Sequence, residues 1–205
     1  MNKDGFLIVV SGFSGAGKGT VVKRLVEEYG YSLSISATTR APRDGEEDGR
    51  EYYFKTVAEF QNLIDYNGFI EWAQYVDNYY GTPRKFVENE MKAGKDVILE
   101  IEVQGAMNVR KQYPNALLIF VTAPDAASLK SRLAGRGTET DEVINKRMKR
   151  AAQESDDIDA YDYIVINDDL EECVKTVHSI IVSNKSLREN NLEFIDKIKS
   201  ELKGL

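Results

Sequence analysis

The sequence contains few of the residues from which several common kinds of site are built. Its 205 residues include one cysteine, Cys173, and one histidine, His178. A single cysteine cannot form a disulfide within the chain, and no second cysteine or nearby histidine accompanies it as a metal ligand. A single histidine likewise excludes a metal site built from several histidines. We interpret His178 as a surface residue of a helix.

The sequence also lacks an apolar run long enough to span a membrane, and its first residues, MNKDG, have no apolar region typical of a signal peptide. Acidic residues outnumber basic ones: the chain has 34 Asp and Glu and 27 Lys and Arg, which gives a net charge of -7. This balance argues against nucleic acid as the main partner. We therefore expect a cytoplasmic protein with no membrane or nucleic-acid partner. An anionic ligand would need local arginine clusters to offset the overall field.

The composition is otherwise that of an ordinary folded protein. Apolar residues make up 42% of the chain and charged residues 30%. The length suits a single domain with a sizeable core, or a core that carries insertions. There is no internal repeat or low-complexity segment, so the organisation has to be inferred from individual motifs.

The most informative stretch is residues 6–20, FLIVVSGFSGAGKGT, in which an apolar run meets a glycine-rich turn. The following VVKRLVEEYG repeats apolar residues at helical spacing, so the segment predicts a strand, a loop and a helix. Glycines let backbone amides close around an anion at the start of a helix, and a lysine can follow the β and γ phosphates of a nucleotide. We predict that this loop binds ATP through Gly12, Phe13, Ser14, Gly15, Ala16, Gly17, Lys18, Gly19 and Thr20.

The loop differs from the usual phosphate loop at one place. The position after Lys18, which normally carries a magnesium-binding hydroxyl, is Gly19, and the hydroxyl comes one place later in Thr20. This GKGT form resembles the loops of nucleoside monophosphate kinases. We expect Mg2+ to bind with ATP and to be contacted by Thr20, directly or through water. The alternative is a glycine-rich turn with an incidental lysine, which the combination of strand, glycines, lysine and helix disfavours.

The rest of the chain alternates strand-like and helix-like segments. Residues 96–102, DVILEIE, form a near-continuous apolar run typical of a parallel strand buried on both faces, with Glu100 and Glu102 on one side of it. Further strands are predicted within residues 116–124 and 161–168. We predict an α/β fold with three layers and a mostly parallel sheet, whose ligands bind at the carboxyl ends of the strands.

One segment breaks this alternation. Residues 33–83 contain short strands, aromatic residues and one helix, and we interpret them as a lobe inserted into a single-domain chain. Within it, Thr56 and Glu59 form a capping box, and Thr82 is predicted to cap the next helix. Asp168 is predicted to cap a later helix.

The C-terminal segment SLRENNLEFIDKIKSELKGL has a helical apolar pattern. It places Leu192, Ile195, Ile198 and Leu202 on one stripe, so it predicts an amphipathic helix. Such a helix would pack either on its own core or on a partner.

Residues 38–54, TTRAPRDGEEDGREYYF, carry a more specific resemblance. The spacing of their threonines, arginines, glutamate, glycine and tyrosine resembles the signature of guanylate kinases, which transfer a phosphoryl group from ATP to GMP. The resemblance continues through FIEWAQYVDNYYGT, ILEIEVQG, LAGRGTET and VINDD, from Phe6 to about Ser183. It implies a P-loop kinase fold with a core (1–32, 84–134 and 160–205), a GMP-binding lobe (33–83) and a mobile lid (135–159).

The resemblance also implies roles for individual residues. A GMP phosphate suits two guanidinium groups and hydroxyl donors, and the paired N-H donors of guanine suit one carboxylate. The GMP-binding residues are then Ser36, Arg40, Arg43, Tyr52, Glu71, Tyr80, Thr82, Glu100 and Glu102, with Glu100 or Glu102 near the base or Mg2+. The catalytic residues are Lys18, Arg132, Arg136 and Arg147. Asn167 and Asp168 would line the adenine side.

Two other functions fit parts of the pattern. Guanylate-kinase-like domains of scaffold proteins keep the fold but bind phosphorylated protein segments, and they usually degrade the ATP loop. A related kinase could act on a ribose phosphate, in which case a guanine-reading Glu71 would be lost. The intact loop and Glu71 favour a kinase that uses ATP and GMP, with dGMP as a further candidate, in purine metabolism and GMP recycling. We expect a monomer or a homodimer.

Overall fold

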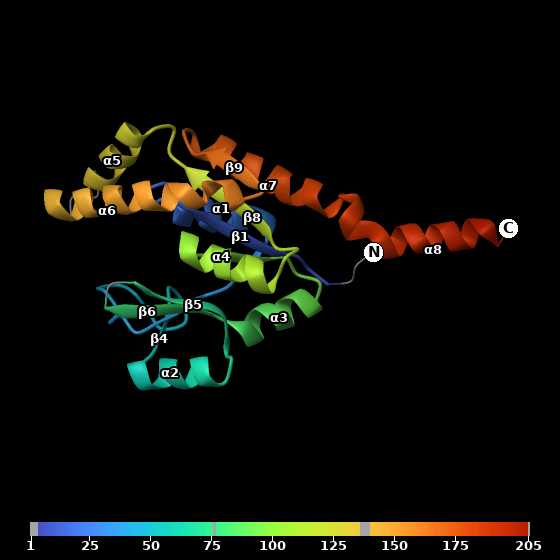
Figure 1. The fold of residues 1–205 in the computed structure, drawn as a ribbon, viewed down its shortest axis with the longest axis horizontal. Helices are drawn as coiled ribbons and strands as arrows, with labels where there is room; N and C mark the ends of the chain where they lie inside the picture. The colour runs from blue at the N-terminus through green and yellow to red at the C-terminus, as the bar shows by residue number, and fades with distance from the viewer. Residues whose placement is uncertain (1–3, 76, 136–139, 205) are drawn as a thin grey trace.

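A five-stranded parallel sheet forms the centre of the molecule (Figure 1). The computed structural model describes residues 4–75, 77–135 and 140–204. In spatial order the strands of this sheet are β2 (Ser32–Leu33), β7 (Val97–Glu100), β1 (Leu7–Gly12), β8 (Leu117–Thr122) and β9 (Tyr163–Ile166). Every pairing in the sheet is parallel, as the apolar runs predict.

Helices cover both faces of this sheet, which gives three layers. They are α1 (Lys18–Tyr29) and α7 (Leu170–Lys185) on one face, and α3 (Arg84–Lys92) and α4 (Val103–Gln112) on the other. Successive side chains of a strand point to opposite faces. Accordingly, Ile8 and Val10 of β1 pack in the cluster with α1 and α7, whereas Leu7 and Val9 pack with α3 and α4. The predicted three-layer α/β class is confirmed.

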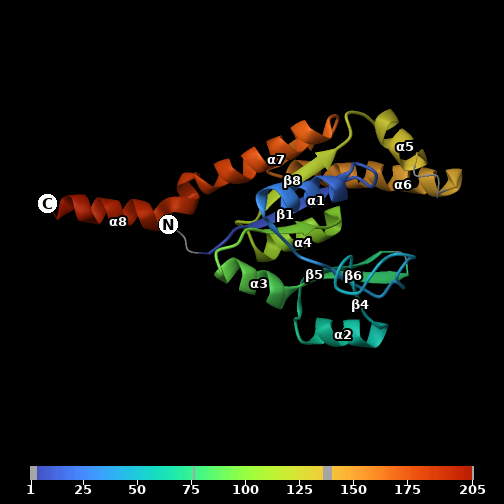
Figure 2. The ribbon, with the colours of Figure 1, turned by 180° about the vertical axis from the view of Figure 1, so that it is seen from behind.

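A second sheet lies apart from the first, on the side of α3 and α4 (Figures 1 and 2). Its strands, in order, are β4 (Tyr53–Phe54), β3 (Ala37–Thr38), β6 (Asn78–Pro83) and β5 (Phe69–Tyr75). Helix α2 (Val57–Asp65) packs on it through Phe60, whose ring stacks on Phe69 with centroids 4.4 Å apart. The chain crosses from the central sheet to this one between Leu33 and Ala37, close to the predicted start of the lobe.

The remaining elements follow β8 and β9. Helices α5 (Ala126–Ala134) and α6 (Asp141–Glu154) lie together at one end of the molecule, and η1 (Ser155–Ala160) leads into β9. After α7, a short turn η2 (Arg188–Asn191) leads into α8 (Leu192–Lys203), which projects away from the body (Figure 2). Among the described helices, none combines the length and apolar character needed to cross a membrane.

The predicted helix caps have different outcomes. Thr56 and Glu59 form the reciprocal capping box of α2. Thr82 does not cap α3, because it lies in β6 and its hydroxyl points elsewhere; Pro83 precedes the helix without a side-chain bond. Asp168 does not cap α7 either, since the neighbouring Asp169 accepts the Glu172 N–H at 2.9 Å.

The capping box should hold α2 on the second sheet. We expect Thr56→Ala to destabilise α2 by about 1 kcal/mol, because it removes the acceptor for the Glu59 N–H. Amide hydrogen exchange of residues 57–65 should become faster, with little change in the central sheet. Thr56→Ser, which keeps the hydroxyl, is the matched control. Equal exchange in all three proteins would contradict this role for the box.

Candidate active site

The loop between β1 and α1 is shaped by glycines that no other residue could replace without strain. Gly12 and Gly17 have φ angles of 145° and 89°. A Cβ atom on Gly12 would lie 1.9 Å from the Val121 carbonyl oxygen, and one on Gly17 would lie 2.5 Å from the Asn167 side-chain nitrogen. The backbone of the loop therefore packs directly against β8 and the end of β9, at the carboxyl edge of the sheet.

Two side chains hold this loop in place. Lys18 is buried, and its ammonium donates to the carbonyl oxygens of Gly12 at 2.7 Å and Phe13 at 3.2 Å. Asn167, buried at the end of β9, donates to the Ala16 carbonyl at 2.8 Å. The adjacent Asp168 is exposed. Asn167 thus positions the loop, and the predicted contact of both residues with adenine stays a prediction.

A cleft of about 350 Å3 opens beside the loop, between the central and second sheets. It collects side chains from segments far apart in the sequence. Ten of the predicted site residues line it, namely Ser14, Lys18, Ser36, Arg43, Tyr52, Glu71, Tyr80, Glu100, Glu102 and Arg147. Among the other predicted site residues, Thr82 is buried, Arg40 is half-buried, and Gly19 and Thr20 are exposed. The cleft is therefore the place where a ligand can meet both sheets.

Glu71 contributes a buried carboxyl group to the cleft, and the residue is 6% exposed. Glu71 on β5 pairs with Thr82 on β6, whose hydroxyl donates to the carboxylate at 2.7 Å. The other carboxylate oxygen faces α4, where a Cβ atom on Gly105 would lie 2.8 Å from it. Burial raises the pKa of Glu71 to about 7, against the lowering effect of the Thr82 hydrogen bond. A ligand with two adjacent N-H donors would favour its ionised form.

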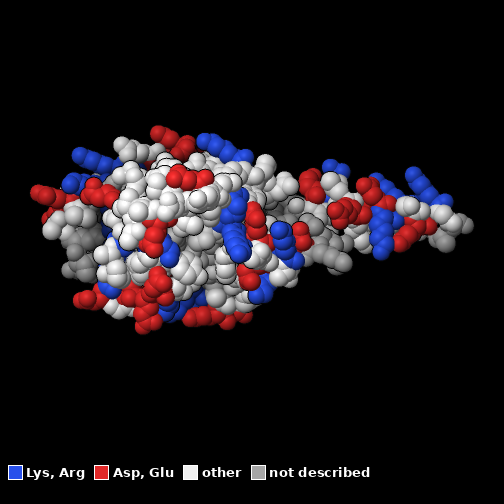
Figure 3. Space-filling model, turned by 90° about the horizontal axis from the view of Figure 1, so that it is seen from below, with Lys and Arg blue, Asp and Glu red and all other residues white. Residues whose placement is uncertain are grey.

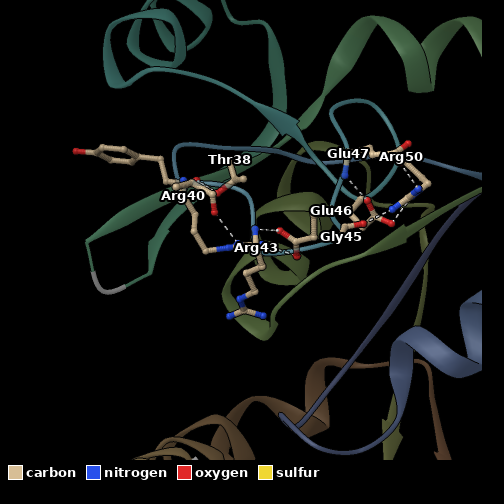
Figure 4. Close-up of polar contacts among 10 residues, drawn as sticks. Thr38, Arg40, Arg43, Gly45, Glu46, Glu47 and Arg50 are labelled. Atoms are coloured by element: carbon tan, nitrogen blue, oxygen red, sulfur yellow. Dashed lines mark hydrogen bonds and ion pairs between the residues drawn. The ribbon is translucent and has the colours of Figure 1, made fainter. Parts of the chain in front are cut away.

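Arginines from the 38–54 segment approach the cleft from the second sheet (Figure 4). The Arg40 guanidinium bonds to Glu46 at 3.0 Å, and it lies over the Tyr52 ring, 5.4 Å from the centroid. The same glutamate accepts the Arg43 backbone N–H at 2.8 Å, while the Arg43 side chain points away from it and lines the cleft. The Tyr52 and Tyr80 rings meet edge to face at 6.0 Å. Glu46 therefore holds the side chain of Arg40 and the backbone of Arg43.

Glu100 is the last residue of β7, and Glu102 lies two residues further on, immediately before α4. Glu100 lies toward the phosphate loop, since a Cβ atom on Gly19 would be 3.4 Å from its carboxylate oxygen. The side chain of Glu100 is open to the cleft. Desolvation by the cleft walls nevertheless raises its pKa, with Lys18 acting to lower the pKa and Glu102 acting to raise it. Glu100 therefore lies next to Gly19 of the phosphate loop, and the choice between Glu100 and Glu102 for the base or Mg2+ stays a prediction.

The predicted lid arginines are placed differently from one another. Arg147 of α6 donates to the Ser14 hydroxyl at 3.1 Å and lines the cleft. Arg132, in the last turn of α5, is not among the residues that line it. Arg136 lies outside the described residues. The catalytic roles of these three arginines stay predictions.

Several cleft residues are absent from the predicted site. Arg150 lines the cleft and bonds to Glu154 at 2.7 Å. Arg50 also lines it, and bonds to Glu51 at 2.5 Å and to Glu47 at 3.0 Å. Ser34 is buried beside the cleft, and within the described part of the chain its hydroxyl has no hydrogen-bond partner. The sequence signal for Ser34 is its alternation with Ser32 and Ser36. Arg50 and Arg150 lie in charged runs of the sequence that are typical of a solvated surface.

A phosphate loop at the carboxyl edge of a parallel three-layer sheet, facing a cleft with arginines and a buried carboxylate, defines a P-loop nucleotide kinase. Comparison with known proteins identifies the family. The family model for guanylate kinase matches residues 5–184, so this chain belongs to the guanylate kinase family and is an enzyme of that class.

Similar proteins agree with this assignment over almost the whole chain. The chain is 46% identical to a guanylate kinase of Caldanaerobacter subterraneus over 202 residues, covering 98% of both proteins. It is 49% identical to a guanylate kinase of Bacillus subtilis over 191 residues, covering 92% of this chain and 94% of that one. A crystal structure of guanylate kinase from Anaplasma phagocytophilum matches it with a TM-score of 0.76 and 31% identity, covering 91% of this chain and 89% of that one.

The burial of Glu71 should make stability depend on pH. Between its ordinary value of 4.5 and about 7, the folded state keeps a proton that the unfolded state has lost. The contribution of Glu71 therefore becomes more unfavourable as pH rises through this window. We expect Glu71→Gln to be more stable than the wild type at pH 8, by up to about 3 kcal/mol, and nearly equal to it at pH 5.

This difference is measured by urea unfolding without nucleotide at both pH values. Glu27→Gln, at an exposed position of α1, is the control and should give the same small change at each pH. A constant difference between Glu71→Gln and the wild type would show that Glu71 is ionised throughout.

Proposed function

We propose that the enzyme transfers the γ-phosphoryl group of ATP to GMP, yielding ADP and GDP. The observation that carries this proposal is the buried carboxylate of Glu71 in a cleft that also contains the phosphate loop. Guanine presents its N1-H and its exocyclic amino group side by side, and one carboxylate can accept from both. Adenine has an acceptor at N1, so Glu71 would select against AMP.

The groups around Glu71 fit the rest of the base. The Thr82 hydroxyl already donates to one carboxylate oxygen, which fixes the orientation of the group. Ser36 lines the same cleft and offers a hydroxyl to O6 of guanine. Close to the cleft, Ser34 adds a buried hydroxyl that has no partner among the described residues. These groups would recognise guanine without discriminating GMP from dGMP by their own contacts, so dGMP remains a second candidate acceptor.

The acceptor phosphate fits the basic part of the second sheet. Arg40 and Arg43 supply guanidinium groups, and Tyr52 and Tyr80 supply phenol donors, at the boundary of the same cleft. A phosphate monoester carries between one and two negative charges at neutral pH and forms charge-assisted bonds with such groups. Because its oxygen is already ionised, the reaction needs no general base. The absence of a histidine from the cleft is then no obstacle.

On the donor side, the loop amides and Lys18 would bind the ATP phosphates, with Arg147 next to them from α6. Lys18 and Arg147 would stabilise negative charge as it moves toward the leaving oxygen. Thr20 and Glu100 offer the oxygen ligands that Mg2+ prefers, and the described residues contain no acidic or histidine cluster able to hold a metal by itself. Mg2+ bound with ATP would add charge neutralisation between the two nucleotides.

Other functions fit this site less well. A non-catalytic interaction domain has no need of a loop whose lysine is held against two carbonyl groups, or of Arg147 beside that loop. A kinase for a ribose phosphate has no need of a buried carboxylate in the acceptor site. We propose a cytoplasmic enzyme of purine nucleotide metabolism that recycles GMP. A coupled ADP-release assay with ATP and each of the four common nucleoside monophosphates tests the proposal, and turnover with GMP alone is the expected result.

Base selection should depend on Glu71. In Glu71→Gln, one acceptor oxygen becomes an amide donor that faces a guanine N-H. A charged hydrogen bond contributes roughly 1.5–3 kcal/mol and a buried unmatched donor costs about 1–3 kcal/mol. We expect kcat/KM for GMP to fall on the order of a hundredfold or more, and kcat/KM for AMP to fall much less. An equal loss for both nucleotides would assign Glu71 a purely structural role.

Turnover should depend on Lys18. Removing its ammonium takes away a cation that would follow charge in the transition state, so we expect Lys18→Ala to lower kcat by about a thousandfold. Lys18 also holds the loop in place. The thermal unfolding of the Lys18→Ala protein should therefore be compared with that of Asn167→Ala, which removes the hydrogen bond to the Ala16 carbonyl. A folded Lys18→Ala protein with kcat near that of the wild type would exclude the loop from catalysis.

A further inference from the structure

The conformation of helix α4 does not explain why position 105 is a glycine. Gly105 is the third residue of α4, and it lacks the positive φ angle that makes glycine necessary at Gly12 and Gly17. Glycine is also the weakest helix former after proline, so an alanine at this position would favour the helix. A glycine inside a helix that has no such backbone reason indicates a close contact that a side chain would disturb.

That contact is with the carboxyl group of Glu71. A Cβ atom on Gly105 would lie 2.8 Å from a carboxylate oxygen of Glu71 and 3.2 Å from its carboxyl carbon. The third nearest atom, Cδ1 of Ile101, would lie 3.4 Å away, which is an ordinary packing distance. The glycine therefore makes room for one carboxyl group in particular.

Glu71 differs from the other acidic residues in its surroundings. On the face of the molecule drawn in Figure 3, acidic and basic side chains mix at the surface. Of the acidic residues that the structure describes, Glu71 and Glu154 are buried, and Glu154 accepts a hydrogen bond from Arg150 at 2.7 Å. Glu71 instead accepts from the neutral hydroxyl of Thr82. Its position is therefore set by uncharged neighbours.

Two of these neighbours fix the plane of the Glu71 carboxyl group. The Thr82 hydroxyl donates to Oε1 at 2.7 Å, and the backbone of Gly105 lies against Oε2. Thr82 comes from the strand that pairs with β5, whereas Gly105 comes from α4. A carboxylate that accepts from two adjacent N-H groups has to lie close to their plane, because hydrogen bonds weaken steeply as they bend. Both contacts therefore affect whether Glu71 can accept from two donors at once.

We propose that Gly105 is a positioning residue for base recognition, which keeps the Glu71 carboxylate in the plane of the guanine N1-H and amino groups. This inference rests on the proposed function. Carbon and oxygen atoms in contact lie at least roughly 3.3 Å apart, so a side chain at position 105 would displace the carboxylate oxygen by about half an ångström. A functional group has to be held within about 0.5 Å of its productive position. The glycine therefore serves recognition, although alanine would favour the helix.

Steady-state kinetics with GMP and with inosine monophosphate (IMP) test the proposal. IMP keeps the N1-H of guanine but lacks the amino group, so it can donate only once to Glu71. We expect Gly105→Ala to lower kcat/KM for GMP by about tenfold or more, and kcat/KM for IMP by much less, because a single hydrogen bond tolerates rotation of its acceptor better than a pair does. KM for ATP should not change. Lys111→Ala, at an exposed position of the same helix, is the control and should leave all three values unchanged.

A second background tests whether the added methyl group acts through Glu71. In a Glu71→Ala protein the carboxyl group is gone, so the methyl group has nothing to displace. In that background we expect Gly105→Ala to change kcat/KM for GMP little and to raise the midpoint of thermal unfolding, because alanine favours the helix. If Gly105→Ala alone does not fold, its combination with Glu71→Ala should restore folding, and a failure to do so would overturn the proposal.

The remaining outcomes separate this inference from the proposed function. A wild-type enzyme that does not phosphorylate GMP would contradict the proposed function, and this inference with it. If the wild type phosphorylates GMP and a folded Gly105→Ala protein has the same kcat/KM, only the role of Gly105 is overturned. An equal loss for GMP and IMP, or an equal loss with and without the Glu71 carboxyl group, would also overturn it, because either result assigns the effect to the fold.

Discussion

The structure of the cleft depends on burying the carboxylate of Glu71, which forms no ion pair with any residue that the structure describes. The Glu71 carboxylate accepts a hydrogen bond from the Thr82 hydroxyl, and desolvation raises its pKa to about 7. Such a group is costly unless the surrounding chain fixes its position and a ligand completes its hydrogen bonds. The β5–β6 register supplies Thr82, and the glycine at position 105 lets α4 approach the second carboxylate oxygen. Two strands of the second sheet and helix α4 thereby meet at one carboxyl group.

The net charge of the chain makes the local arrangement of charge important. A protein with a charge of -7 has to bind two anionic nucleotides against its overall field. Guanidinium groups are concentrated at the cleft, and neighbouring carboxylates hold several of them. Glu46 holds Arg40 and the backbone of Arg43, and Glu154 holds Arg150. Each of these glutamates offsets the positive charge of an arginine in the net charge of the protein, and it also fixes the direction of the guanidinium group that it contacts.

Much of this could be predicted from the sequence, because the strongest signals are local. The loop of residues 12–20 follows from its glycines, its lysine and the strand and helix beside it, and the Thr56 box follows from two residues three apart. Thr82 was expected to cap a helix, since its alternative, a hydroxyl bond across a hairpin, depends on the pairing with Glu71. The role of Gly105 depends on contacts between segments more than 30 residues apart. For α8 the pattern predicts amphipathicity, but the pattern of one helix cannot specify what covers it.

The side chains that would meet the nucleotides already have neutral partners. Lys18 donates to two carbonyl groups, Arg147 to the Ser14 hydroxyl, and the Glu71 carboxylate accepts from Thr82. In the proposed reaction, a phosphate would replace the neutral acceptors of Lys18 and Arg147 with an anionic one. The exchange would add charge–charge attraction to hydrogen bonds that already have a charged donor. The gain would be largest where charge grows during the reaction, at Lys18 and not at Thr82. An enzyme built in this way keeps its site ordered before substrate arrives and still favours the transition state over the bound reactants.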